Sequence, residues 1–266
     1  MVRTGARRAF GARLRSFLSH ELGNRVSAFA AGLGITAVLQ SSTAVGLMVT
    51  GFAREGLVGS VPALSAMLGA NVGSTLIVQL LTFDVTRIAP IPVLAGYLLF
   101  RRARAGLRDF GRVLIGLGLV LVALHLFMSV LSPITANAAA RAFLAGLSAH
   151  IVLIVIIGTL LTWAAHSSVA IVLLAMSLTQ QGVLNLPAGI ALVLGANLGS
   201  AINPVIEGGA QDNAGRRLPI GNLLNRLTGV LLMLAVYPLV TPLIEAIERN
   251  PVRAIANFHT GFNILL

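Results

Sequence analysis

The sequence predicts an all-α, polytopic helical membrane protein built from two inverted-topology repeats. Three observations predict this class. Hydrophobic residue types make up 56% of the 266 residues and charged types only 10%, whereas a soluble domain has about 25% charged residues. Long apolar segments follow one another from Ala28 to Val240, and a sequence repeat relates the two halves. Each half is expected to contain a re-entrant helical hairpin and a broken helix.

Composition excludes several other classes. The chain has no cysteine, which excludes disulfides and thiolate metal sites. All 19 basic residues are arginine, and the formal net charge is +11. Nucleic acid is not an expected partner, because the chain has one Trp and lacks the basic and aromatic interleaving of base-stacking surfaces. Arginine also anchors the cytoplasmic loops of membrane proteins, so the lipid bilayer is the expected partner.

The repeat is free of gaps and has an offset of 126 residues. Positions 32–81 and 158–207 share 13 identities among 50 residues. The Ser-Ser pair at 41–42 recurs at 167–168, and the string Leu-Gly-Ala-Asn-x-Gly-Ser at 68–74 recurs at the same offset. Apolar segments readily share Leu and Ala by chance, but they do not readily share these polar strings at one fixed spacing. The repeat therefore predicts two copies of one structural unit.

The predicted elements follow from the apolar segments and the loops between them. A basic cytoplasmic lead-in occupies 1–27, and the first repeat (28–131) contains a hairpin at 28–53, a broken helix at 57–82, and helices at 86–100 and 113–131. After an extracytoplasmic connection at 132–147, the second repeat (148–243) contains a hairpin at 148–179, a broken helix at 186–206 and a helix at 218–243. Residues 244–266 form a tail and the start of a final helix.

The distribution of arginine sets the expected orientation. Arginine clusters at residues 3–25, 101–112 and 216–217 should all face the cytoplasm. This requires that the segments 28–53 and 148–179 dip into the bilayer and return to the same side. Three crossings then separate the two halves, so they are inverted relative to each other, as in many transporters. We expect a multi-pass protein of the plasma (cytoplasmic) membrane with a cytoplasmic N-terminus.

Four consecutive polar side chains interrupt the first hairpin segment: Gln40, Ser41, Ser42 and Thr43. An unsatisfied polar group in lipid costs several kcal/mol, so this cluster should meet protein, water or a ligand. At a hairpin turn, the N–H groups of the returning helix suit an anion, whereas hydroxyls and carbonyls suit an alkali cation. The hydroxyls could instead serve helix–helix contacts, but the recurrence at Ser167 and Ser168 favours a binding site.

Polar residues also recur in the middle of the next apolar segment. They are Asn71, Ser74 and Thr75 in the first copy and Asn197 and Ser200 in the second. The glycines beside them weaken a helix by about 1 kcal/mol each, and an unwound stretch would expose carbonyls and the amide to a coupling ion. Close helix packing through Gly-x-x-x-Gly spacing is the alternative. That alternative explains the glycines but not Asn and Ser at the same depth in both copies.

His166 stands where Gln40 stands in the first copy. Its imidazole can hydrogen-bond as an amide does and titrates near neutral pH, although a packed structural histidine is an equal alternative. No carboxylate lies deep in an apolar segment, which argues against a proton relay. A site of hydroxyls, amides and N–H groups suits an anionic substrate. The sequence shows no catalytic arrangement, metal-ligand spacing or nucleotide loop, so neither an enzyme nor a cofactor is predicted.

The tandem Gln-Ser-Ser-Thr and Gly-Ala-Asn-x-Gly-Ser elements resemble the type II sodium/phosphate cotransporter family, including its bacterial members. The resemblance covers nearly the whole chain and implies sodium-coupled phosphate symport by alternating access, with Na⁺ as the coupling ion. It implies that phosphate lies between two facing hairpin turns, near their hydroxyls and N–H groups. It implies sodium ligands at Gln40, Ser41, Thr43, Ser167 and Ser168. The polar residues of the broken helices would approach this site, and a homodimer is left open.

Three features depart from the family pattern. The second turn has His166 where the family usually has Gln, which bears on sodium stoichiometry and coupling. The chain starts after a helix that precedes the basic lead-in in the family, and residues 256–260 resemble the start of its final helix. A member shortened at both ends, without a C-terminal regulatory domain, is therefore expected. Transport of another oxyanion or small solute, a passive channel and a non-transporting scaffold are the alternatives.

Overall fold

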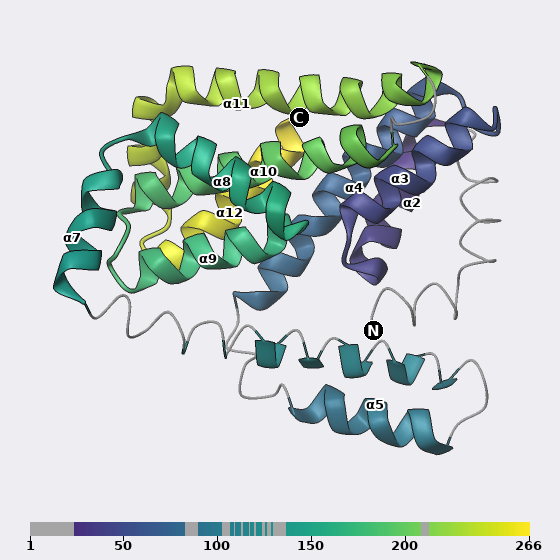
Figure 1. The fold of residues 1–266 in the computed structure, drawn as a ribbon, viewed down its shortest axis with the longest axis horizontal. Coiled ribbons are helices and arrows are strands. Elements are labelled where there is room, and N and C mark those ends of the chain that lie inside the picture. Colours follow the sequence, from purple (N-terminus) through teal and green to yellow (C-terminus); the bar gives the residue numbers. More distant parts are fainter. Residues whose placement is uncertain are drawn as a thin grey trace.

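The computed structural model describes residues 24–82, 90–102, 137–208 and 213–266, together with short stretches between 107 and 129. All regular secondary structure in these residues is helical, as predicted (Figure 1). The helices are α2 (Arg25–Leu39), α3 (Ser42–Arg54), α4 (Ser60–Leu81), α5 (Pro90–Arg102), α7 (Ala138–Leu147), α8 (Ile151–Ala165), α9 (Ser168–Gln180), α10 (Leu186–Gly208), α11 (Asn213–Ile247) and α12 (Pro251–Leu265).

Several helices have the length and composition of membrane spans. In the described part of the chain, Ser60–Leu81, Leu186–Glu207 and Arg216–Ile247 qualify. A helix of 22 residues is about 33 Å long at 1.5 Å per residue, against a hydrocarbon core of about 30 Å. Large apolar side chains on α11, such as Leu232 and Leu239, are exposed, which suits a surface in lipid. The fold is that of a helical membrane protein.

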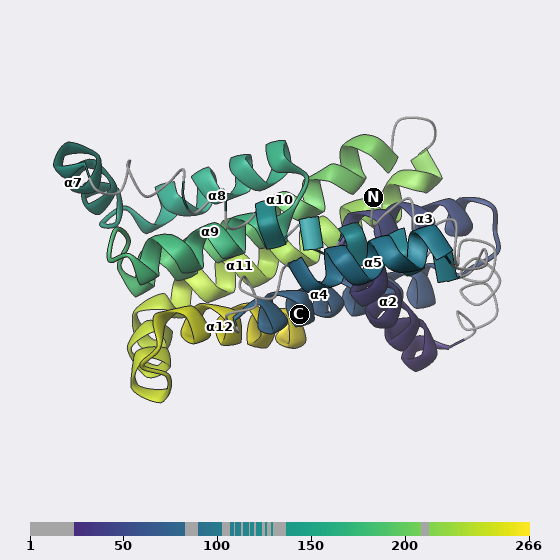
Figure 2. The ribbon, with the colours of Figure 1, turned by 90° about the horizontal axis from the view of Figure 1, so that it is seen from below.

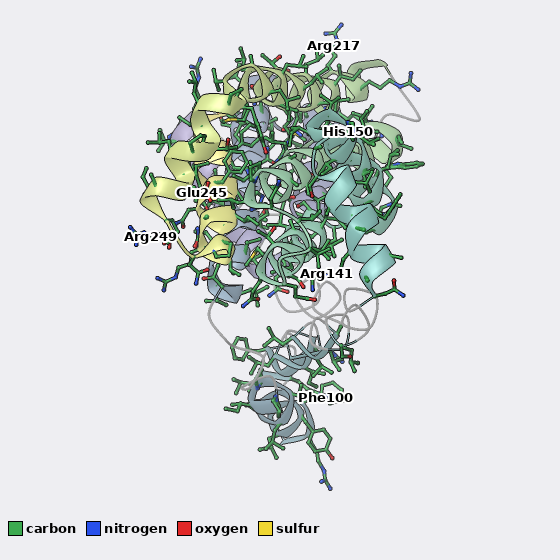
Figure 3. All side chains as sticks on the ribbon, turned by 90° about the vertical axis from the view of Figure 1, so that its left-hand side faces the viewer. Phe100, Arg141, His150, Arg217, Glu245 and Arg249 are labelled. Atoms are coloured by element: carbon green, nitrogen blue, oxygen red, sulfur yellow. The ribbon has the colours of Figure 1, made fainter. Side chains whose placement is uncertain are left out.

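The bundle is organised around two helical hairpins and two long helices. α2 and α3 form the first hairpin and pack on α4, while α8 and α9 form the second and pack on α10. α3 also packs on α10 and α9 on α4, so each hairpin contacts the long helix of the other half. α11 runs along one side of α10, and α12 lies against α4 and α9 (Figures 1 and 2). α5, marked by Phe100, lies to one side of the bundle (Figure 3).

Glycines let the first arm of each hairpin lie directly on the backbone of the long helix. A Cβ placed on Gly69 would lie 1.9 Å from the carbonyl oxygen of Phe29. In the second half, a Cβ on Gly195 would lie 2.2 Å from the carbonyl oxygen of Val155. The two glycines are separated by the repeat offset, and so are their two contact residues. The repeat found in the sequence is therefore also present in the packing of α2 on α4 and α8 on α10.

Helices are present at the predicted segments 57–82 and 186–206, but the break predicted within each of them is wrong. α4 and α10 are continuous through both Gly-Ala-Asn-x-Gly-Ser strings, and the one proline inside α10, Pro204, lies beyond its string. The glycines serve the close packing that was the alternative interpretation, and that packing offsets their weak helix propensity. The hydroxyls of Ser74 and Ser200 turn back to the carbonyls three residues earlier, at 2.7 and 2.9 Å. That of Thr75 does the same at 2.8 Å.

Other bounds also differ from the prediction. The connection at 132–147 was expected to be a loop, yet 138–147 forms α7, whose first N–H groups are capped by Asn137. The axes of α7 and α8 meet at 107°. The predicted tail contains a full helix, α12, started by Pro251. The segment expected at 86–100 begins at Pro90 in the described residues. Residues 1–23 and much of the segment 113–131 lie outside the described part of the chain.

The Gly69 contact yields a test of the packing. We expect Gly69→Leu to force α2 and α4 apart, because the added side chain meets backbone that cannot move aside, at a cost of about 1–3 kcal/mol or more. The measurement is the melting temperature of the purified protein in detergent. The control is Gly34→Leu on α2, where an added Cβ meets nothing within 4 Å. Equal melting temperatures for the two variants would show that the close crossing does not determine stability.

Candidate functional site

The two hairpins turn in the same way. Gln40 and His166 have φ of 53° and 54° and are the non-glycine residues with left-handed backbone in the described chain. Such a conformation is uncommon outside glycine and marks a turn fixed by its surroundings. The two residues are related by the repeat offset. The sequence thus placed both turns correctly, at the polar residues that interrupt each apolar segment.

A serine begins the second arm of each hairpin. The hydroxyl of Ser41 accepts a hydrogen bond from the Ala44 N–H at 3.2 Å, and the hydroxyl of Ser167 accepts one from the Ala170 N–H at 3.3 Å. These are N-cap interactions, which satisfy one of the four free N–H groups at a helix start. The remaining N–H groups and the partial positive charge of each helix start face the turn. Both turns therefore carry hydroxyls and N–H groups suited to an anion.

The other predicted turn residues differ in burial. Thr43 and Ser168 are buried, while Gln40, Ser41, Ser42 and Ser167 are partly buried. The His166 side chain is 57% exposed, and its Nε2 lies 3.2 Å from Oε1 of Glu207 near the end of α10. His166 therefore lies at the rim of the candidate site. It is neither the packed histidine considered as an alternative nor a buried ligand.

Residues of both hairpins approach the last turns of α10. His166 reaches Glu207 directly. On the other hairpin, Gly46 of α3 lies against Pro204, whose Cγ is 3.7 Å from the position of a Cβ on that glycine. Pro204 and Glu207 are three residues apart on α10, so they are neighbours on its surface. One end of α10 is thus flanked by residues from both hairpins.

Two buried threonines lie one helical turn before the hairpin turns. Thr36 on α2 and Thr162 on α8 are fully buried, and their hydroxyls have no hydrogen-bond partner in the described chain. Leaving a buried hydroxyl without a partner costs roughly 1–3 kcal/mol. The two residues are identical members of the repeat and lie against Gly73 and Gly199. They were not predicted as site residues, although their recurrence at the repeat offset could have identified them.

The two predicted asparagines are buried and reach the same helix. Nδ2 of Asn71 donates to Oδ1 of Asn222 at 3.2 Å. Oδ1 of Asn197 accepts from Nη1 of Arg226 at 2.8 Å. Asn222 and Arg226 are four residues apart on α11, so they share one face of that helix. The structure therefore brings the two copies of the Gly-Ala-Asn string together along α11, although neither string unwinds.

Arg226 is the centre of a buried polar cluster. Its Nη1 also donates to the backbone oxygen of Asn197 at 2.8 Å, and its Nη2 donates to Oδ1 of Asn263 on α12 at 3.3 Å. Asn263 in turn donates to Oδ1 of Asn197 and to the carbonyl of His259, both at 2.8 Å. Arg226 is 2% exposed and forms no ion pair within the described residues. Nε of Arg226 and Nδ1 of His259 have no hydrogen-bond partner there.

Arg226 was missed by the sequence prediction. It lies inside the apolar segment predicted at 218–243, whereas the arginine clusters were interpreted as cytoplasmic anchors. A charged residue within a membrane segment is by default a candidate functional residue, so its position alone could have identified it. Figure 3 shows the contrast, because the labelled side chains of Arg217, Glu245 and Arg249 lie at the periphery of the bundle.

Comparison with known proteins finds relatives along the whole chain. The family model described as Na+/Pi-cotransporter matches residues 1–129 and 127–266. The chain is 38% identical over 268 residues to an Escherichia coli (strain K12) protein named "Putative inorganic phosphate export protein YjbB", covering 100% of this chain and 49% of the relative. The Salmonella typhimurium protein of the same name is 39% identical over 269 residues, with the same coverage.

A Bacillus subtilis protein, "Uncharacterized protein YqeW", is 27% identical over 253 residues, which are 95% of this chain and 81% of that protein. The chain thus spans about half the length of the enterobacterial relatives. No solved structure is significantly similar to it. Because the family model covers both halves of the sequence, the chain belongs to the Na+/Pi-cotransporter family.

Proposed function

We propose that the chain carries inorganic phosphate across the plasma membrane by sodium-coupled symport, with substrate and ion held near the two hairpin turns. This proposal rests chiefly on the equivalence of the two turns. Each turn combines a residue in the left-handed conformation with a serine N-cap at the same position of the repeat. Membership of the Na+/Pi-cotransporter family supports phosphate and sodium. The name of the Escherichia coli relative also refers to inorganic phosphate.

The lengths of the hairpin arms support re-entrant segments. α2 and α8 each have 15 residues, or about 22 Å at 1.5 Å per residue, which is short of a hydrocarbon core of about 30 Å. α4 and α10 run in opposite directions along the bundle (Figure 1), as inverted repeats require. Together with the arginine clusters, these features favour turns that lie within the bilayer and a cytoplasmic N-terminus.

Different groups at the turns bind the two solutes. Phosphate is held by the hydroxyls and free N–H groups at the starts of α3 and α9, where the helix dipoles favour an anion. Sodium is held by oxygen atoms: the Gln40 amide, the turn hydroxyls and the last carbonyls of α2 and α8. The unpartnered hydroxyls of Thr36 and Thr162 join this set, because an ion would satisfy them. Alternating access then exposes the site to each side in turn.

A symporter moves its solutes in the direction set by their combined gradients, so coupling to sodium is compatible with either uptake or export. Transport of another oxyanion on the same site, or passive conduction, are the competing functions. They differ from phosphate symport in what drives flux and in which anion is carried. Both can be tested on the isolated chain.

The first test is a cation exchange in liposomes. We expect phosphate uptake by the reconstituted full chain to fall to the level of empty liposomes when potassium replaces sodium outside, because the turn oxygens need a small cation to be satisfied. The measurement is uptake of radiolabelled phosphate at fixed ionic strength. Uptake that is indifferent to every cation gradient would instead identify a channel or uniporter.

The second test removes both serine caps. We expect Ser41→Ala combined with Ser167→Ala to reduce phosphate uptake at least about tenfold, since both turns lose a hydroxyl, while each lost cap costs about 1 kcal/mol of stability. Uptake and melting temperature are measured together. Asn137→Ala, which removes the cap of α7, is the matched control and should retain uptake. Wild-type uptake by the double variant would exclude the turns as the site.

The third test concerns the histidine turn. We expect His166→Gln to lower the sodium concentration for half-maximal uptake at least about twofold, because an amide oxygen is a better sodium ligand than an imidazole. Glu207→Gln is the control, since it removes the carboxylate charge beside His166 while keeping the imidazole. A sodium titration that is unchanged in His166→Gln, or shifted equally in both variants, would remove His166 from coupling.

A further inference from the structure

A lone positive charge lies inside the bundle at Arg226. Its hydrogen-bond partners are the backbone and side-chain oxygens of Asn197 and the side-chain oxygen of Asn263, all of them neutral. Within the described residues, the side-chain carboxylates are those of Glu55, Glu207, Glu245 and Glu248, and none pairs with it. Neutral oxygens orient a guanidinium but do not cancel its charge. A buried charge without a counter-ion is costly in a protein interior and more so within a bilayer.

The guanidinium of Arg226 is held mainly through Nη1, and its Nε–H has no hydrogen-bond partner in the described chain. Nη1 makes two bonds of 2.8 Å to Asn197, whereas the Nη2 bond to Asn263 is longer, at 3.3 Å. Nε is buried and has no partner in the described chain. Arginine binds oxyanions through two parallel N–H donors, and this planar geometry makes it the preferred residue for phosphate. The free Nε and the weakly held Nη2 are therefore available to such a ligand.

Other buried polar atoms without a partner belong to the same helices. Nδ2 of Asn203 on α10 is buried without a partner among the described residues. Nδ1 of His259 on α12 is likewise unpartnered, and this residue is close enough to Arg226 for an electrostatic interaction. Asn197 and Pro204 are seven residues apart, or about 10 Å along the helix. The cluster thus lies about two helical turns before the end of α10 that both hairpins flank.

We propose that Arg226 is the charged member of the oxyanion-binding site: it binds the transported phosphate through Nε and Nη2 and makes the pathway selective for anions. This inference rests on the function proposed above and adds a site on α11, outside the aligned stretches 32–81 and 158–207. Arg226 is closed off from solvent in this structure, so the anion reaches it in the state in which the helices part. The arriving anion supplies the missing counter-charge.

Two substitutions test this role in the reconstituted full chain. We expect Arg226→Gln to raise the KM for phosphate at least about tenfold, the loss of one charge-assisted contact, while the sodium concentration for half-maximal uptake stays within about twofold. Arg226→Lys keeps the charge but not the two-nitrogen geometry, so its KM should lie between those of Arg226→Gln and the wild type. Arg217→Gln is the matched control, because Arg217 is exposed on the same helix. It should behave as the wild type.

A binding measurement separates this role from a structural one. Inorganic phosphate should raise the melting temperature of the wild-type and Arg217→Gln proteins, compared with chloride at equal ionic strength. It should not raise that of Arg226→Gln. A folded Arg226→Gln protein with wild-type KM and a normal phosphate shift would overturn the proposal. If Arg226→Gln does not fold, a wild-type KM in Arg226→Lys would overturn it.

The proposed function and this inference can fail separately. Wild-type protein that takes up no phosphate in a sodium gradient contradicts the proposed function, whatever the variants do. Wild-type protein with sodium-driven uptake and an unchanged KM in folded Arg226→Gln contradicts only the role of Arg226. A KM that rises together with an equal loss of sodium affinity also counts against it, because a general distortion of the site would change both.

Discussion

The backbone-to-backbone crossing of the first hairpin arm and the following long helix is the contact on which the rest of the structure depends. In lipid there is little hydrophobic drive to bring helices together, so association relies on close packing at small residues. Gly69 and Gly195 provide that packing by placing α4 and α10 directly on the carbonyls of α2 and α8. These crossings fix the position of each hairpin along its long helix, and hence the place of its turn in the bundle.

The place of the turns determines which polar groups gather there. Each first arm ends after 15 residues in a left-handed residue, and each second arm starts at a capping serine. Helix starts, hydroxyls and last carbonyls therefore gather at each turn, and in the proposed re-entrant arrangement lipid could not satisfy them. Thr36 and Thr162 show the same constraint one turn earlier, since both hydroxyls are buried by the crossing and left without a partner in the described chain. A turn of this kind is tolerable when a solute or an ion completes its hydrogen bonds.

The sequence predicted the turns more accurately than the helices. Gln40, Ser41, His166 and Ser167 interrupt apolar segments at one fixed offset, and polar residues within an apolar segment strongly favour a break in the helix. Glycine is ambiguous, because Gly69 and Gly195 can either unwind a helix or let two helices approach. The repeat could not distinguish these two roles, because both copies carry the same glycines. The close contacts of Gly69 with α2 and of Gly195 with α8 show that the glycines serve helix packing. The position of Arg226 within an apolar segment could have identified it, but its partners could not be predicted. Asn197 and Asn263 are distant in sequence and come together only when α10, α11 and α12 pack.

The polar cluster also shows that the two aligned stretches, 32–81 and 158–207, meet different partners on α11. Asn71 and Asn197 are equivalent members of the repeat, yet one meets a neutral Asn222 and the other the charged Arg226, both on α11. A fully symmetrical arrangement would place an arginine against each asparagine, and two like charges in a low-dielectric interior disfavour each other. A single helix serving both motifs supplies one charge instead of two. The two copies of the Gly-Ala-Asn string are thus equivalent in sequence but differ in the charge of their partner on α11. Charge is the property that distinguishes a site for an anion from a site for a cation.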